Sequence, residues 1–264
     1  MLQAYWYIAK MRILTTIAYR FEVFAAVGSQ MIIMLAAVYL WKTAYSGDTS
    51  STTMQLNQIV TYTIISILLG SVFICDVQDT IYHKIREGQI AVDLYRPIML
   101  LGSYLADDLG TMMSSVVNKV LPLFVLASLL FEVPLPDSFT SFLLFVPSCV
   151  LSYAILWLLS AIVGLVAFWV MELGNMGMVK DSIVRILSGS IVPLWFFPSS
   201  VQTVSQFLPF QYTYQTPLAI YIGEISPLDA LTAMGIQFVW IAALYALLYV
   251  VWSKAKKKTL IQGG

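Results

Sequence analysis

The sequence predicts an all-α integral membrane protein, and two observations support this fold class. Of its 264 residues, 59% are hydrophobic and only 11% are charged, and the mean hydropathy is +0.83. Soluble domains carry about 25% charged residues, so this composition argues against a water-soluble globular enzyme. Residues 32–40 and 241–251 are apolar all round, whereas helices on a soluble core keep a polar face. We therefore expect lipid around these helices.

Six stretches have the length of a transmembrane helix, which needs about 20 mostly apolar residues. They cover residues 21–41, 56–75, 102–131, 139–170, 179–197 and 228–252. The third and fourth stretches exceed one bilayer thickness, so we expect them to be tilted or to project into the cytoplasm. We assign all of them to a single transmembrane domain that covers residues 1–264.

Residues 1–20 are predicted to form a helix in the membrane interface. Lys10, Arg12 and Arg20 interrupt the apolar stretch, and no small-residue cleavage site follows a short apolar region, so a cleaved signal peptide is not expected. Apolar residues recur at helical spacing on one side, namely Leu2, Trp6, Ala9, Ile13 and Ile17. The alternative is a ragged lead-in to the first span.

The basic residues predict the orientation. Fourteen Lys and Arg balance fourteen Asp and Glu, so the chain as a whole offers no electrostatic case for binding nucleic acid. With a cytoplasmic N-terminus and six spans, twelve of the fourteen basic residues lie inside, Lys42 lies outside and Lys119 lies within the third span. This bias follows the positive-inside rule. We expect a multi-pass protein of the cell (cytoplasmic) membrane with both termini in the cytoplasm.

Residues that carry catalytic or metal chemistry are sparse. Cys75 and Cys149 lie in apolar runs, and His83 is the sole histidine, so the usual zinc and iron ligand sets cannot be assembled. A magnesium site built from carboxylates stays open. The sequence has no P-loop and no hydrolase or dinucleotide-binding motif. We expect no cofactor in this chain and a non-catalytic role, with a membrane-embedded enzyme as the least favoured alternative.

The longest cytoplasmic connection, residues 76–97, is predicted to form a compact charged knob. Ile81 and Ile85 stand one helical turn apart, Gly88 is suited to end their helix, and a second short helix ends before Pro97. Aliphatic anchors beside charges suit docking into a soluble partner. A solvated helical loop is the alternative.

The connection at 193–223 is predicted to dip into the outer leaflet as a re-entrant helical hairpin. Pro198, Pro209 and Pro217 exclude one continuous helix, and the many aromatic residues are typical of an interfacial belt. An aromatic belt without a transport role is the alternative. Lys119, inside a span, is a possible pathway residue, or it snorkels or pairs with Glu172 or Asp108.

Two motifs carry a resemblance to a known family. The first is Ile85-Arg-Glu-Gly88-x4-Asp93-Leu-x-Arg96-Pro97, and the second combines Leu194-Trp-Phe-Phe-Pro198, Leu208-Pro-Phe210, Pro217 and Tyr221-x-Gly223. In order and spacing they resemble permease subunits of type-2 ABC exporters, closest to a bacterial branch often found as paired permeases with a separate ATPase. The resemblance covers essentially the whole chain.

The resemblance implies specific roles and partners. A coupling helix would dock on the ATPase through His83, Arg86, Glu87, Gly88, Asp93, Arg96 and Pro97. A short inner segment at 174–181 would make a second contact. An outer gate would include Phe197, Pro198, Pro209, Phe210, Pro217, Tyr221 and Gly223. ATP and magnesium would bind the partner ATPase, and a second permease, the same or a homologous chain, would complete a dimer in the lipid bilayer.

The leading hypothesis for function is export of a hydrophobic or amphipathic substrate, such as a drug, lipid or peptide, driven by that ATPase. The substrate class is predicted from sparsely charged spans that contain Met31, Met34, Tyr62, Phe73, Met176 and Met178. Ordinary packing explains the same residues. A secondary transporter, which would have inverted repeats and broken helices around a midplane charge, is the main alternative.

Overall fold

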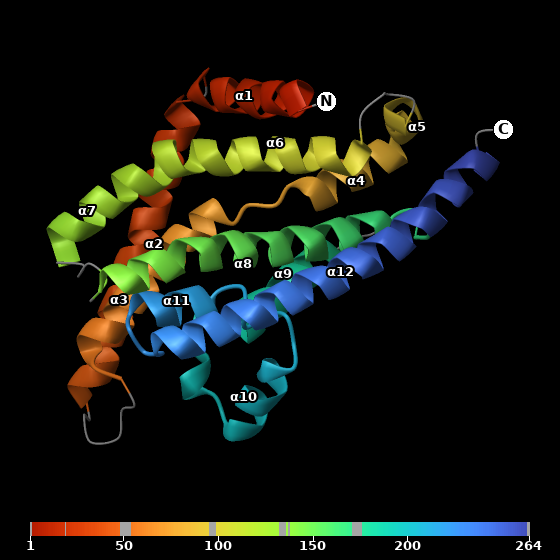
Figure 1. The fold of residues 1–264 in the computed structure, drawn as a ribbon. Coiled ribbons are helices and arrows are strands. Elements are labelled where there is room, and N and C mark those ends of the chain that lie inside the picture. The colour runs from red at the N-terminus through yellow and green to blue at the C-terminus, as the bar shows by residue number, and fades with distance from the viewer. Residues whose placement is uncertain are drawn as a thin grey trace.

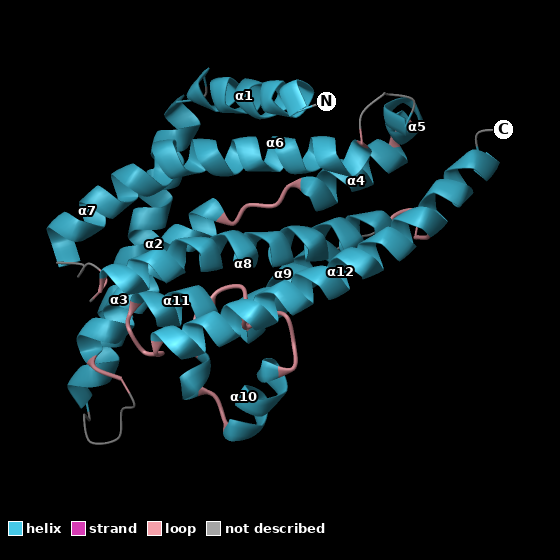
Figure 2. Ribbon diagram, in the orientation of Figure 1, coloured by secondary structure: helices cyan, strands magenta, loops and turns pink. Residues whose placement is uncertain are grey.

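The structure, a computed structural model, describes residues 2–18, 20–47, 54–94, 99–131, 136, 138–170 and 176–262. Every regular element in these residues is a helix (Figure 2), which confirms the all-α class. The elements are α1 Leu2–Ala18, α2 Arg20–Gly47, α3 Leu56–Val72, α4 Val77–Arg86, α5 Gln89–Leu94, α6 Leu100–Ser115, η1 Val116–Val120, α7 Leu121–Phe131, α8 Phe139–Val166, α9 Met176–Leu187, η2 Leu194–Phe196, α10 Ser199–Gln206, α11 Gln215–Tyr221 and α12 Pro227–Gln262.

Five helical segments of the described chain are long and apolar enough to cross a membrane. They are Phe21–Ser46, Leu56–Arg86, Leu100–Phe131, Phe139–Val166 and Pro227–Lys257. They correspond to expected spans one, two, three, four and six. The fifth expected span, 179–197, is not a single helix, because α9 ends at Leu187. Its 12 residues extend about 18 Å, whereas a bilayer core is about 30 Å thick.

Local chemistry explains why the helix stops there. Ser188, Gly189 and Ser190 follow α9, and Gly189 has a φ of +79°, a conformation that L side chains rarely adopt. Pro193 then precedes η2, a single 3-10 turn. The backbone groups freed by this break are satisfied from elsewhere: the Tyr62 hydroxyl donates to the carbonyl of Gly189 (2.7 Å) and the Ser66 hydroxyl to that of Ser190 (2.6 Å). A non-helical segment in an apolar protein thus keeps its polar groups paired.

The helices separate the molecule into two ends (Figure 1). The C-terminal ends of α2 and α7 and the N-terminal ends of α3, α8 and α12 lie together, with α10 beside them. The N-terminus, α4, α5 and the C-terminal end of α12 lie toward the opposite end. The long helices α8 and α12 pack side by side and run in the same direction. This arrangement puts the knob and the outer connection at different ends, as the sequence predicts.

Helix α1 packs along α6 (Figure 1). Gly110 permits this close approach, because a Cβ there would lie 2.7 Å from the carbonyl oxygen of Ala9. The backbone N–H of Met99 also donates to the hydroxyl of Tyr5 at 3.1 Å. The residues of the predicted apolar face lie in two environments: Ala9 is buried against α6, while Trp6 is 64% exposed. Helix α1 therefore packs against the bundle and still presents apolar surface outward.

The buried core lies between α3, α8, α11 and α12, and a polar cluster holds part of it together. Gln237 of α12 is fully buried, and its amide nitrogen donates to Ser152 Oγ of α8 (3.0 Å) and to the carbonyl of Tyr212 (2.8 Å). The Ser148 hydroxyl donates to Gln237 Oε1 at 3.3 Å. These bonds join two spans to the connection that carries α11.

Candidate coupling and translocation sites

Helices α4 and α5 form the charged knob that the sequence predicts, and we call residues 77–94 the coupling knob. Helix α4 ends at Arg86, and Gly88 follows with a φ of +74°. The backbone N–H of Glu87 donates to the carbonyl of His83, and that of Gly88 to the carbonyl of Ile85. Gly88 is thus the predicted helix stop, and α5 begins at Gln89.

The turn of the coupling knob is exposed. His83, Arg86, Glu87 and Gly88 are all exposed, so four of the residues expected to dock on the ATPase are open to solvent. Arg96 and Pro97, also matched to it, lie outside the described residues. Charged groups of both signs on a short, fixed turn suit recognition of a soluble partner.

Asp93 and Ile81 are buried, unlike the residues of the turn. Asp93 is 6% exposed and pairs with Lys84, while the Tyr104 hydroxyl donates to the same carboxylate at 3.4 Å. The Asp93 carboxylate therefore fixes α5 against α4 and α6, and its burial keeps it from a docking partner. Ile81, interpreted as an anchor for a partner, is fully buried inside the fold. Val92 is 64% exposed and is the aliphatic side chain that α5 offers instead.

At the base of the coupling knob, two acidic side chains lie close to one cation. Arg12 of α1 lies 3.5 Å from a carboxylate oxygen of Asp76 and 3.7 Å from one of Asp107. Arg12 Nε also donates to Thr111 Oγ1 at 3.1 Å. Next to this surface group, Asp108 is buried and accepts bonds from α4 and α8. The knob is thereby connected to α1, α6 and α8.

The second inner contact, expected at 174–181, is only partly described, since 171–175 lie outside the described residues. Lys180 in α9 donates to Ser160 Oγ of α8 at 2.8 Å and pairs with Asp181 at 2.9 Å. Gly177 lies against the side chain of Gln78, where an added Cβ would clash with the amide nitrogen. The start of α9 therefore touches both α8 and the coupling knob.

Lys119 lies in η1, a single π-helical turn between α6 and α7. Such turns occur rarely and frequently at functional sites. Lys119 is half-buried. Asp108, one of its expected partners, takes its hydrogen bonds from the backbone of α4 and from Trp157. Glu172, the other expected partner, lies outside the described residues.

The outer connection is built from two helices with opposite environments. Helix α10 starts after Pro198 and stands away from the bundle (Figure 1), whereas α11 is buried against α3, α8 and α12. Pro217 lies in the first turn of α11, where a helix tolerates proline. Of the residues matched to the outer gate, Pro209, Pro217 and Tyr221 are buried, Phe197 and Phe210 are half-buried, and Pro198 and Gly223 are exposed.

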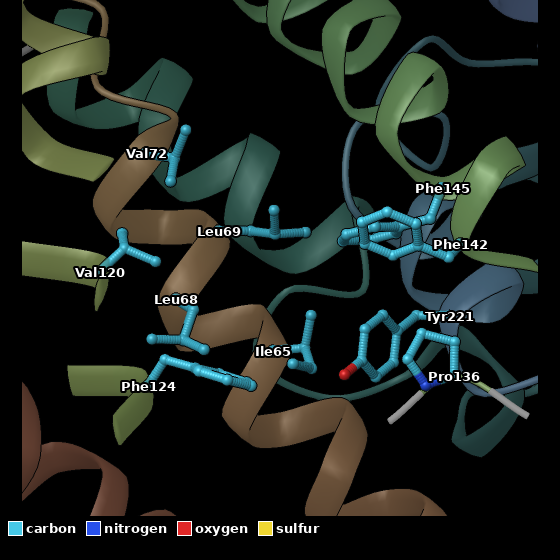
Figure 3. A pocket seen from close by; sticks show the side chains of 10 residues that line it. All are labelled: Ile65, Leu68, Leu69, Val72, Val120, Phe124, Pro136, Phe142, Phe145 and Tyr221. Carbon is cyan, nitrogen blue, oxygen red and sulfur yellow. The ribbon is translucent and has the colours of Figure 1, made fainter. Parts of the chain in front are cut away.

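A recess of about 340 Å³ lies where α3, α7, α8 and α11 meet (Figure 3). Figure 3 shows Leu68 and Phe124 on one side and the rings of Phe142, Phe145 and Tyr221 on the other. Its lining is completed by Ile65, Leu69, Val72, Val120 and Pro136. None of the methionines and aromatic residues named as substrate candidates lines it: Met34, Tyr62 and Phe73 are buried in the core, while Met176 and Met178 are exposed.

This recess has the features of a site for an apolar ligand. Cavities of about 150 Å³ lined by aliphatic and aromatic residues bind benzene, so a larger recess has room for two rings or a hydrocarbon chain. Signals for it were present in the sequence as apolar residues at helical spacing in three separate segments, but only the tertiary fold brings these together with Pro136 and Tyr221. Among the described residues, no group of three or more His, Cys, Asp or Glu could hold a metal ion.

The comparisons with known proteins agree with the helical architecture. None of the curated proteins compared with the chain matches it. A family model described as ABC-2 family transporter protein matches residues 31–263, which is nearly the whole sequence. The match begins within α2 and includes the coupling knob, the broken α9 segment and the outer connection. The chain therefore belongs to the ABC-2 transporter family and is a multi-pass transmembrane permease subunit of an ABC transporter.

Proposed function

We propose that this chain is the membrane-spanning subunit of an ATP-driven exporter that moves a hydrophobic or amphipathic substrate. The observation that carries the proposal is the exposed, charged turn of the coupling knob. His83, Arg86 and Glu87 stand on a short helix pair that is fixed to the spans at its base. A partner ATPase that binds this turn can transmit its closure to the spans.

The proposal includes where the complex resides and how it assembles. The lysines at the end of α12 and the coupling knob lie at one end of the molecule, which the positive-inside rule places in the cytoplasm. The chain then resides in the cytoplasmic membrane with both termini inside. A second permease, the same or a homologous chain, completes the pathway, and ATP with magnesium binds the partner ATPase.

The apolar recess supports the class of substrate. Its lining residues come from three spans, from α11 and from Pro136 between two of the spans, and the lining surface is apolar. Burial of a hydrocarbon chain stabilises a complex by about 0.8 kcal/mol for each CH₂ group. A drug, lipid or peptide with an apolar part would be retained in this recess, whereas a small ion would not.

Reconstitution tests the proposal. The chain is purified from its native host under mild conditions, and the ATPase that co-purifies with it is identified and reconstituted with it in liposomes. We expect ATP-dependent movement of a fluorescent phospholipid or an amphipathic dye, and loss of that movement with Arg86→Glu. A chain that transports alone, with no ATPase bound, would overturn the proposal.

A secondary transporter is the second candidate, and the break after α9 is the observation that favours it. Transporters of that kind use discontinuous helices around their sites, and residues 188–193 form such a discontinuity. Ion gradients across liposomes that contain the chain alone separate the two functions. Transport driven by a gradient without ATP supports the second candidate.

A further inference from the structure

Asp108 is a buried carboxylate that joins three elements at the base of the coupling knob. It belongs to α6, and its side chain is almost completely enclosed, with the residue 2% exposed. Oδ1 accepts from the backbone N–H of Asp76 at 3.1 Å, and Oδ2 accepts from that of Val77 at 3.2 Å. Oδ2 also accepts from Nε1 of Trp157 in α8 at 2.9 Å. One carboxylate therefore binds the start of α4 and the middle of α8 together.

The carboxylate performs the capping that the local sequence does not. The first N–H groups of a helix have no partner within it, and a negative group there is favoured by the helix dipole. Asp76 occupies the N-cap position of α4, yet its side chain makes no capping hydrogen bond and pairs with Arg12. Asp108, which lies 32 residues after Asp76 in the chain, accepts from the N-cap residue and the first helical residue instead.

Helix α4 also touches α8 with little space between them. A Cβ added to Gly164 would lie 3.0 Å from the Cα of Gln78 and 3.2 Å from the Cβ of Ile81. Gly164 and Trp157 lie two turns apart along α8. The start of α4 is thus held against α8 by backbone contact and by the Asp108 carboxylate.

The two ends of the coupling knob are fixed by different bonds. Near the exposed turn, Lys84 pairs with Asp93 and holds α4 to α5. At the base, Asp108 holds α4 to α6 and α8. A change at the base can therefore leave the docking surface intact.

We propose that Asp108 is a positioning residue that makes α8 follow the movement of the coupling knob when the ATPase binds ATP. This role rests on the proposed function, since it needs an ATPase on the knob. Helix α8 in turn carries Phe142 and Phe145 of the apolar recess and packs along α12. Movement of α4 would thereby reach both the recess and a second span.

The experiment uses the permease bound to its co-purifying ATPase in nanodiscs. Three variants are compared: Asp108→Asn, which replaces a shared carboxylate oxygen by an amide group, Trp157→Phe, which removes one donor, and Asp107→Asn as the control. Asp107 is the neighbouring carboxylate, partly exposed and facing Arg12. The readouts are ATPase affinity and the ATP-dependent change in amide hydrogen exchange of residues 152–166.

We expect the affinity of Asp108→Asn for the ATPase to stay within about threefold of wild type. The ATP-dependent change in its hydrogen exchange should fall about tenfold, which corresponds to the free energy of a lost helix cap. Trp157→Phe should give a smaller loss in the same direction, and Asp107→Asn should retain the change. If Asp108→Asn does not fold, Trp157→Phe decides the question alone. If Asp108→Asn, or Trp157→Phe in its place, shows the full ATP-dependent change in hydrogen exchange, the role of Asp108 is overturned. If the wild-type chain binds no ATPase, the proposed function is overturned, and this role with it.

Discussion

The coupling knob and the broken segment around residues 188–194 interrupt the spans in different ways. At the knob, ionic groups make the attachments: Arg12 with Asp76, Lys84 with Asp93, and Asp108 with the start of α4. At the broken segment, neutral hydroxyl and amide side chains bind backbone groups. Both regions pair their polar groups, yet one uses charge and the other does not.

The difference reflects the solvent that each region meets. Charged side chains are costly in the bilayer core, while neutral hydroxyl and amide groups are common bonding partners between spans. The knob keeps its charges because its turn is exposed and its buried carboxylates are paired: Asp93 lies against Lys84, and Asp108 accepts three hydrogen bonds. We therefore expect the broken segment to determine stability and the knob to determine association with a partner.

Replacement of Gln215 by leucine should have the largest effect on stability. Gln215 Oε1 accepts from the backbone N–H of Leu194 at 3.1 Å and lies 2.8 Å from the Tyr62 hydroxyl. Gln215→Leu leaves a buried backbone donor unpaired, which costs about 2 kcal/mol. Thermal unfolding in detergent measures the loss. Thr203→Val in the exposed helix α10 is the control, and equal melting temperatures for the two variants would contradict the assignment.

A smaller loss of stability is expected where α1 meets α6. Gly110→Ala places a Cβ 2.7 Å from a backbone oxygen of α1, so the two helices must separate. Such overpacking typically costs about 1–3 kcal/mol, and we expect the lower end of this range because the two helices can shift apart. It should also weaken the contacts of Arg12. Gly28→Ala is the matched control, since an added Cβ there meets nothing within 4 Å. Detergent melting curves should show a lower midpoint for Gly110→Ala only.

Charge reversal on the knob should leave stability unchanged and weaken partner binding. Arg86 and Glu87 are exposed, so Arg86→Glu and Glu87→Lys should change unfolding free energy by less than about 0.5 kcal/mol. Each should lower affinity for the ATPase about tenfold at low salt, and less at high salt because exposed charges are screened. Titration of the ATPase at two ionic strengths measures this. A loss independent of salt would mean that the turn does not bind through its charges.

Local sequence patterns predicted the elements of the knob but not its internal bonds. Gly88 ends α4 because glycine readily adopts a positive φ. The end of this helix can therefore be predicted from the residue type at one position. The burial of Asp93 and the capping by Asp108 depend on groups brought together by the fold, 31 residues apart for Asp108 and Val77. The position of a carboxylate in the sequence does not indicate which helix its side chain will contact in the fold.

The fifth span shows the opposite case, where a local signal outweighs hydrophobicity. Residues 179–197 are apolar enough to predict a span, yet Ser188, Gly189 and Ser190, with Pro193 shortly after, end the helix. These residue types are recognised breakers. The break persists because Tyr62, Ser66 and Gln215 satisfy its backbone, and those three partners could not be predicted from the sequence of the segment itself.

Lys119→Met should have the smallest effect on stability and separates a pathway role from a structural one. Lys119 lies half-buried in the π-helical turn, and Asp108 accepts its bonds from other groups. Methionine keeps the length of the side chain and removes the charge, so unfolding free energy should change by less than about 0.5 kcal/mol. If Lys119 faces the pathway, the range of dyes transported should shift toward cationic ones, since a repelling charge is gone. Comparison of a cationic and a neutral dye in liposomes checks this, and transport with an unchanged substrate range would exclude the pathway role.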